Sequence, residues 1–419
     1  MSPDWLALDT AHVWHPYTQH GIAPEAHPIV RGEGAYLVDA KGHRILDAVS
    51  SWWTNLHGHA HPAIAEAVAE QARTLEQVIF AGFAHEPAAR LAAELVAVLP
   101  RGLTRVFYSD NGSTAVEAAV KMALQYWRHR GERRPVIAAL ENAYHGDTFG
   151  AMSASARGVF TEPFAEHLFE VARLPDPTEG DTLAALDALL ERRGGEVAAL
   201  IVEPLLLAAG GMRVWSEETL RALRRRTEEA GVLLIADEVA TGFGRTGPLF
   251  ACGRAGVSPD LACLSKGITG GFLPLGVTAA REEIFEAFRS EDRRRTFFHG
   301  HSYTGNPLAC AAARASLRLL DEGCAARRDA IEAAHRAGVE RLGGRVRGAR
   351  VLGTVAAFDL EAPEGYLSPV GRELAAFVRG HGVLLRPLGN VVYLMPPYCA
   401  TPDEVAGVYS LVERFLERG

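Results

Sequence analysis

Short apolar runs alternate with amphipathic stretches through the middle of this chain, and the spacing predicts alternating strands and helices. The apolar runs are too short and too uncharged to be solvated, which is typical of buried parallel strands; they lie at 106–109, 136–140, 198–202, 232–236 and 261–265. The amphipathic stretches predict helices near 62–73, 86–99, 114–130 and 217–230. This alternation predicts an α/β fold with a parallel sheet covered on both faces.

The two ends of the chain follow a different pattern. Residues 35–38 and 44–47 alternate around the turn-forming segment 39–42 and predict a hairpin. Near the other end, long Ala/Arg/Leu helices precede short strands close to 351–360 and 391–395. We interpret both ends as one smaller α+β domain. The predicted segments are 1–60 (small domain), 61–305 (large domain) and 306–419 (small domain).

Composition narrows the classes of function. A net charge of −8 provides no basic field for a nucleic-acid backbone. Five scattered cysteines without Cys-x-x-Cys spacing predict neither a disulfide framework nor a zinc site. Residues 1–5 have no basic or apolar signal pattern, and no apolar run is long enough for a membrane span. We therefore expect a cytoplasmic protein without a metal, which binds neither nucleic acid nor membrane.

An acid and an amine end two of the predicted strands. Asp237 follows 232–236 and Lys266 follows 261–265, where open α/β sheets bind ligands. Only three of the 43 basic residues are lysine, and arginine cannot form a Schiff base. Lys41 lies in a predicted turn and Lys121 in a predicted helix, so Lys266 alone has a suitable position. This pair suits a pyridoxal phosphate enzyme, in which an acid keeps the pyridine nitrogen protonated.

The same cofactor needs a phosphate cup and an aromatic beside its ring. The segment 109–114 lies between a predicted strand and helix, where a glycine and free N–H groups favour a phosphate. It also fits a capping box, since Thr114 precedes Glu117 by three, and the two interpretations are compatible. Tyr144 follows the strand 136–140, so its ring can stack on the cofactor or serve the loop structurally.

Other interpretations of these residues stay open at this stage. Asp237 fits a structural ion pair with Arg245 or with Lys266 as well as a cofactor contact. The segment 242–247 matches G-x-G-x-x-G, but Pro248 follows and no helical run begins there. We therefore do not interpret it as a nicotinamide or flavin site.

A long motif points to a known family. The run 234–247, Leu-Ile-Ala-Asp-Glu-Val-Ala-Thr-Gly-Phe-Gly-Arg-Thr-Gly, followed by Leu264-Ser265-Lys266-Gly267, resembles the signature of class III aminotransferases. The resemblance extends from about residue 12 to residue 399. It implies pyridoxal 5′-phosphate as cofactor and the fold-type I architecture: a large domain with a mostly parallel sheet and a small α+β domain from both termini. It also implies a homodimer with shared active sites.

Further stretches are similar to one branch of this family, which acts in biotin synthesis. They are Trp14–Thr18, Ser50–Trp53, Lys121–Trp127, Tyr144–Ser153 and Tyr393–Tyr398. Enzymes of this branch convert 8-amino-7-oxononanoate into 7,8-diaminononanoate. Most take the amino group from S-adenosylmethionine, and related enzymes take it from lysine. The His-Ser pair at 301–302 also occurs in lysine users, whereas Tyr17 favours S-adenosylmethionine. The remaining alternative is an ω-amino-acid transaminase, against which Tyr17 and the Trp-Trp pair argue.

The resemblance also implies roles for single residues. The residues expected to hold the cofactor are Gly112, Ser113, Tyr144, Glu203, Asp237, Lys266, His301 and Ser302. Those expected at the substrates are Tyr17, Trp52, Tyr144, Lys266, Gly300 and Arg386. Lys266, Asp237 and Tyr17 are expected to take part in catalysis. Gly300, His301 and Ser302 would reach across the dimer, and Ser302 would touch the phosphate of the partner's cofactor.

The substrate residues have simpler explanations when taken without the family pattern. Trp52 and Trp53 fit core packing, and Arg386 fits an exposed surface arginine. However, a planar guanidinium matches a carboxylate in a bidentate pair, and aromatic walls suit a long, mostly apolar keto acid.

Overall fold

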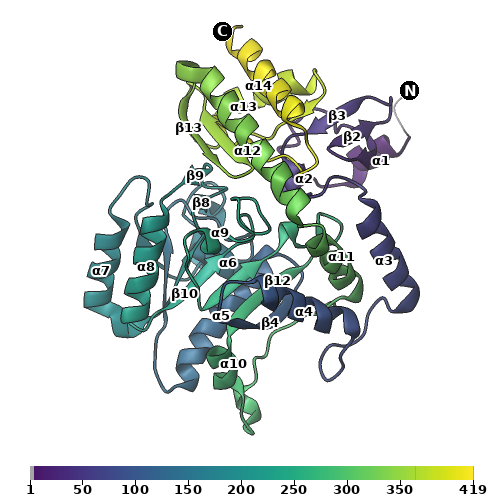
Figure 1. The fold of residues 1–419 in the computed structure, drawn as a ribbon. Helices are drawn as coiled ribbons and strands as arrows, with labels where there is room; N and C mark the ends of the chain where they lie inside the picture. Colours follow the sequence, from purple (N-terminus) through teal and green to yellow (C-terminus); the bar gives the residue numbers. More distant parts are fainter. Residues whose placement is uncertain (1–3, 364, 419) are drawn as a thin grey trace.

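The computed structural model describes residues 4–363 and 365–418, and it gathers the predicted βα region into one seven-stranded sheet (Figure 1). Its strands in spatial order are β4 (Leu103–Ser109), β12 (Gly276–Arg281), β11 (Leu261–Leu264), β10 (Leu233–Asp237), β7 (Val197–Val202), β5 (Val136–Leu140) and β6 (Ala172–Leu174). Among these strands only β12 runs antiparallel to its neighbours. The mostly parallel sheet is therefore confirmed. Residues 1–3, which belong to the N-terminal segment predicted to have no export signal, lie outside the described residues.

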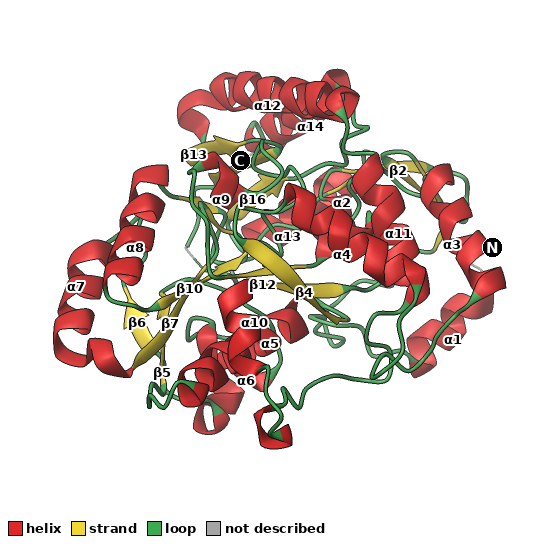
Figure 2. Ribbon diagram, turned by 60° about the horizontal axis from the view of Figure 1, so that its bottom comes forward, coloured by secondary structure: helices red, strands yellow, loops and turns green. Residues whose placement is uncertain are grey.

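Both faces of this sheet are covered, because side chains of the central strands alternate between two cores. Ile201 and Ile235 pack in the cluster that contains helix α5 (Gly112–His129). Leu200 and Leu234 pack in the cluster that contains α7 (Thr182–Arg193) and α8 (Glu217–Glu229). Figure 2 shows α5 and α10 on one side of the sheet, with α7 and α8 beside β6 and β7. The completely apolar strands follow from this double coverage.

The ends of the chain combine in smaller sheets. One sheet has the order β1 (Ile29–Glu33), β2 (Tyr36–Asp39), β3 (Arg44–Asp47) and β15 (Val383–Leu384). A second has the order β13 (Arg347–Leu352), β14 (Val355–Asp359) and β16 (Val391–Leu394). Because β15 pairs with β3, the two ends form one small α+β unit, visible at the top of Figure 1. The boundaries at residues 60 and 305 stay predictions.

The remaining elements connect or cover these sheets. The other helices are α1 (Asp4–His12), α2 (Ser50–Trp53), α3 (Pro62–Thr74), α4 (Glu86–Val98), α6 (Phe149–Ala154), α9 (Ala251–Arg254), α10 (Glu282–Phe288), α11 (Pro307–Arg318), α12 (Glu322–Leu342), α13 (Val370–Arg379) and α14 (Pro402–Leu416). A two-stranded ribbon joins β8 (Leu206–Leu207) to β9 (Arg213–Val214). No helix within the described residues combines the length and apolar character that crossing a membrane requires.

Three local predictions were wrong. The segment 351–360 is not one strand, because a turn at Gly353 (φ +58°) separates β13 from β14. Helix α5 begins at Gly112, and its capping box joins Asn111 to Thr114 instead of Thr114 to Glu117. Glu117 instead accepts hydrogen bonds from Thr148 and from the amides at residues 150 and 151. Asn111–Thr114 and Thr114–Glu117 both have the spacing of a capping box. The sequence does not reveal which of the two pairs begins the helix.

Candidate active site

One cavity of about 530 Å³ brings most of the predicted site residues together. It opens at the carboxyl ends of β7, β10 and β11, beside the start of α5. The predicted residues that line it are Tyr17, Trp52, Gly112, Ser113, Tyr144, Glu203, Asp237, Lys266 and Arg386. The large sheet therefore supplies the charged groups, and segments from the two ends of the chain supply the outer wall. This is the place where open α/β sheets bind ligands.

Asp237 is the last residue of β10, and its carboxylate is buried but fully partnered. Its Oδ2 lies 2.7 Å from Nδ1 of His145, and its Oδ1 accepts a hydrogen bond of 3.1 Å from the amide of Val239. Both side chains are almost completely buried. His145 is a site residue that the sequence did not predict, because only Tyr144 of this adjacent pair has a ring expected to stack on a cofactor. An imidazole hydrogen bond and a backbone amide both favour the charged carboxylate.

The glycine-rich segment 242–247 forms turns between β10 and α9 and opens no helix, as predicted. Its Arg245 is fully buried, and its guanidinium donates to the carbonyl oxygens of Pro396 (2.8 Å) and Trp53 (3.4 Å). The proposed alternative of an Asp237–Arg245 ion pair is therefore wrong.

Lys266 lines the same cavity, with its amine held away from bulk water. Burial lowers the pKa of this amine below its ordinary value, while Asp237 and Glu203 act in the opposite direction. The Nζ atom lies 4.6 Å from the centroid of the Trp53 ring. No ion pair within the described residues includes Lys266, so the alternative of a direct Asp237–Lys266 pair is also wrong. A buried amine that lines a cavity and has a lowered pKa is suited to act as a nucleophile.

Glu203 follows β7 and gives the site a second buried carboxyl group. Its Oε1 accepts a hydrogen bond of 2.8 Å from the amide of Tyr144, and its Oε2 accepts one of 3.1 Å from the amide of Ala208. Burial raises the pKa of Glu203 to about 7, and the charge of Asp237 adds to this effect. Its position near the other charged groups was predicted, but its contact with the Tyr144 backbone was not. Glu203 fixes the loop from which the Tyr144 ring extends.

The start of α5 provides a cup of the kind a phosphate needs. Gly112 and Ser113 hold its first two helical positions, where backbone N–H groups have no acceptor within the helix. Ser113 Oγ accepts a hydrogen bond of 3.2 Å from the amide of Asp147. A Cβ atom at Gly146 would lie 2.1 Å from Ser113 Oγ, so only glycine permits this close approach. This donor set fits the phosphate of pyridoxal phosphate.

Two tyrosines and an acid form a hydrogen-bonded group at the mouth of the cavity. The hydroxyl groups of Tyr17 and Tyr144 are 3.2 Å apart. Both donate to Asp147, with a distance of 2.9 Å from Tyr144 to Oδ1. Partial burial and the nearby Asp147 raise the pKa of Tyr17 to about 12, so its hydroxyl stays protonated. Asp147 was not predicted as a site residue, because an exposed loop acid has no sequence signal that distinguishes it.

Both tryptophans line the cavity, and Trp53 also packs in the buried core. Trp53 is buried, with 4% of its surface exposed, whereas Trp52 is 38% exposed. The Trp52 ring lies 4.2 Å from the Arg386 guanidinium carbon, and its centroid lies 5.2 Å from that of Tyr17 in an edge arrangement. Core packing is therefore correct for Trp53 and wrong for Trp52. Arg386 is half-buried in the cavity wall, so its interpretation as a surface residue is wrong.

The predicted residues Gly300, His301 and Ser302 do not line the cavity of their own chain. The carbonyl oxygen of Ser302 accepts a hydrogen bond of 2.8 Å from Gln77, and the amide of His301 donates to Thr304 Oγ1 at 3.0 Å. These contacts place the segment elsewhere on the same chain. Their predicted role in a partner's site stays a prediction.

Comparison with known sequences places this site in a family. The model of class III aminotransferases matches residues 17–416. The chain is 52% identical to the adenosylmethionine-8-amino-7-oxononanoate aminotransferase of Synechococcus elongatus, over 97% of this chain and 98% of that protein. It is 39% identical to the protein of the same name from Aquifex aeolicus, over 95% of this chain and 93% of that protein.

The fold is also similar to those of solved aminotransferase structures. The adenosylmethionine-8-amino-7-oxononanoate aminotransferase of Methanocaldococcus jannaschii superposes with a TM-score of 0.95 at 34% identity, over 99% of this chain and 98% of that one. An amine transaminase from an uncultivated Pseudomonas species, solved in its PLP-bound form, has a TM-score of 0.90 at 33% identity. That match covers 97% of this chain and 98% of the other.

We predict that Glu203→Gln removes a pH-dependent loss of stability. The folded pKa of about 7 lies above the ordinary 4.5, so folding takes up a proton between these values. The wild type therefore loses stability as pH rises through this window, and the neutral glutamine does not. Relative to wild type, the unfolding free energy of the variant should rise by about 2–4 kcal/mol across the window.

Urea denaturation of the cofactor-free proteins between pH 4.5 and 8 measures this difference. A fixed offset caused by the amide group is compatible with the prediction, because it does not depend on pH. Curves for the two proteins that stay parallel throughout would contradict it.

Proposed function

Because this chain belongs to the class III aminotransferases, we propose that it binds pyridoxal 5′-phosphate at Lys266 and transfers an amino group to 8-amino-7-oxononanoate. The donor is S-adenosylmethionine, the product is 7,8-diaminononanoate, and the reaction belongs to biotin synthesis. The observation that carries this proposal is one cavity in which Lys266 and Asp237 meet a wall formed by Tyr17, Trp52 and Arg386. The names of the relatives support both substrates.

The residues around Lys266 would hold the cofactor in a fixed orientation. The amides of Gly112 and Ser113 would bind its phosphate, and the Tyr144 ring would flank the cofactor ring. Asp237, supported by His145, would hold a proton at the pyridine nitrogen. When bound, pyridoxal phosphate supplies an electron sink for the reacting carbon. Lys266 would serve as its covalent attachment point and as the base that moves the proton, a role that its lowered pKa favours.

The outer wall suits an acid with a long aliphatic chain. Tyr17, Trp52 and Phe160 present aromatic surface along the cavity, and Tyr17 contacts both other rings edge-on. Arg386 supplies a cation at this wall, and its stacking on Trp52 restrains the guanidinium before a substrate binds. A restrained fork binds a carboxylate at a lower cost in entropy. The keto acid would therefore place its carboxylate at Arg386 and its ketone toward Lys266.

A homodimer would complete the site. Large apolar side chains are exposed around the segment of Gly300, His301 and Ser302; they are Ile79, Phe83, Phe298 and Tyr303. Each exposes more than 60% of its surface, which is unusual for side chains of this size unless a partner covers them. In the assembled dimer, Ser302 would donate its hydroxyl to the phosphate in the partner's cavity.

The alternatives differ in the donor or in the pocket. The His301-Ser302 pair also occurs in enzymes that use lysine as donor, whereas Tyr17 at the cavity mouth favours S-adenosylmethionine. The amine transaminase from Pseudomonas shares the fold at 33% identity, so the fold alone does not separate these activities. The proposed identity of the donor therefore rests on Tyr17 and on the names of the relatives.

We predict that S-adenosylmethionine alone converts the yellow holoenzyme to its colourless amine form. Subsequent addition of 8-amino-7-oxononanoate should restore the yellow form, which absorbance in stopped-flow mixing records. Lysine and an ω-amino acid at equal concentration serve as the alternative donors. Faster bleaching by lysine would overturn the choice of donor, and restoration by pyruvate but not by the keto acid would overturn the choice of acceptor.

We predict that Arg386→Ala raises the KM for 8-amino-7-oxononanoate by about 10- to 100-fold, the usual worth of a charge-assisted hydrogen bond. The KM for the donor should change much less, because this carboxylate contact belongs to the keto acid. Arg386→Lys keeps the charge without the planar fork and should lie between the two. Steady-state kinetics with each substrate varied in turn measures the split, and equal increases for both substrates would refute this role.

A further inference from the structure

The two tryptophans at the site extend from a strained turn. Ser50, Ser51 and Trp53 have φ angles of +52°, +60° and +68°, in the region that favours glycine. Such a conformation is strained in any residue that has a side chain. Three such residues within four positions persist only if the surroundings hold the turn in place. The groups that hold it are therefore as important as the tryptophans.

Asp47 makes most of the contacts that hold this turn. It ends β3 and has no exposed surface. Its Oδ2 accepts hydrogen bonds from the amide of Ser51 (2.6 Å) and from Nε2 of His59 (2.9 Å), and its Oδ1 accepts one from the amide of Val49 (3.2 Å). Asn55 Nδ2 lies 2.7 Å from the other ring nitrogen of His59, which fixes the tautomer that donates to Asp47. Such a network compensates for burying the charge.

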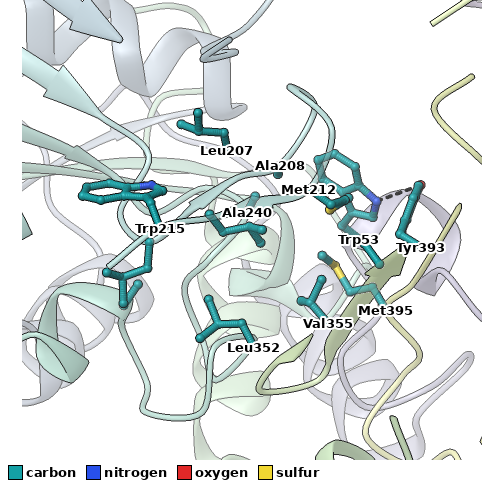
Figure 3. Packing of buried hydrophobic residues seen from close by; sticks show 14 of the residues in the cluster. Trp53, Leu207, Ala208, Met212, Trp215, Ala240, Leu352, Val355, Tyr393 and Met395 are labelled. Atoms are coloured by element: carbon teal, nitrogen blue, oxygen red, sulfur yellow. Dashed lines mark hydrogen bonds between the residues drawn. The ribbon is translucent and has the colours of Figure 1, made fainter. Parts of the chain in front are cut away.

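Two side chains of the turn itself also make hydrogen bonds that hold it. Ser50 Oγ donates to the carbonyl of Met395 at 2.7 Å, and Trp53 Nε1 donates to the Tyr393 hydroxyl at 3.0 Å (Figure 3). Figure 3 also shows Trp53 beside Met212 within the buried cluster. The Trp53 indole is thus fixed at its nitrogen, and Arg245 donates to the Trp53 carbonyl, whereas Asp47 accepts from the backbone amides of Val49 and Ser51.

The turn presents one ring to each cation of the site. The Trp53 ring lies 4.6 Å from the Lys266 amine, and the Trp52 ring lies 4.2 Å from the Arg386 guanidinium carbon. Since adjacent residues of one strained turn make both contacts, a change in its backbone would move both rings. Asp47 itself does not line the cavity. It can influence the reaction only through the turn.

We propose that Asp47 is a positioning residue, which holds the turn of residues 50–53 so that Trp53 faces Lys266 and Trp52 faces Arg386. This inference rests on the proposed function in two respects: the role of Lys266 as the attachment point of the cofactor and the role of Arg386 as the cation that binds the substrate. It assigns Asp47 a role in orienting both halves of the site: the amine that reacts and the cation that binds the substrate.

Asp47→Asn tests this proposal against a matched control, Asp39→Asn. Asp39 is also a buried acid at the end of a strand in the same sheet, and it also holds a turn and a histidine, His43. It does not line the cavity. Both variants should lose stability in urea, but only Asp47→Asn should alter the site. We expect its kcat to fall and its KM for the keto acid to rise, each by about 5- to 20-fold.

A spectral measurement separates positioning from a general loss of stability. The pH midpoint of the cofactor's visible absorbance reports the environment of the Lys266 nitrogen in the holoenzyme, without turnover. A ring over a cation stabilises the charged form, so its displacement in Asp47→Asn should lower this midpoint by about 0.4 unit or more. Asp39→Asn should keep the wild-type midpoint. His59→Gln, which weakens the same carboxylate network, should give a smaller change and replaces Asp47→Asn if that variant does not fold.

Two results would overturn the proposal: a wild-type midpoint with wild-type kinetics in folded Asp47→Asn, or the same changes in Asp39→Asn. The midpoint needs only bound cofactor, so it can be measured even if the substrates differ from those proposed. A failure of the proposed function would instead appear in the wild type, as a lack of colour or of donor conversion.

Discussion

The contact between Asp237 and His145 is the interaction on which the rest of the site depends. A carboxylate at the end of a fully apolar strand would be costly to bury, and the imidazole at 2.7 Å with the amide of Val239 compensates for that cost. This arrangement places a buried carboxylate in the wall of the cavity. The amine of Lys266 lines the same cavity, and burial lowers its pKa. A carboxylate for a basic ring nitrogen and an amine for an aldehyde are the two groups that the proposed cofactor needs.

The large sheet and the small unit contribute different parts of the chemistry. The sheet ends in the charged groups of the cavity, which under the proposed function would hold the cofactor. The small unit brings aromatic rings and Arg386 to the opposite wall, where a substrate would lie. The strained turn at 50–53 joins the two functions, because its adjacent rings face Lys266 and Arg386. Strain concentrated at such a position is typical of sites whose geometry must be fixed.

Much of this organisation could be predicted from the sequence, for physical reasons. Apolar runs such as 198–202 reveal strands buried on both faces, and the scarcity of lysine singles out Lys266. Strand β12 was not predicted, since its antiparallel direction depends on pairing with β4 and β11 rather than on local composition. Likewise, His145 and Asp147 take part in the site through contacts that only the folded chain creates. The stretch 144–153 contains both residues, but the sequence does not show which side chains they contact.

The most direct test of this account is to locate the covalent bond between the chain and its cofactor. Reduction of the purified yellow holoenzyme with borohydride converts a lysine Schiff base to a stable secondary amine, and peptide mass spectrometry identifies the modified residue. The account predicts one modified lysine, Lys266, with Lys41 and Lys121 unmodified, and no modification in Lys266→Ala. A cofactor fixed to either of the other lysines, or retained as a stable adduct in Lys266→Ala, would contradict it.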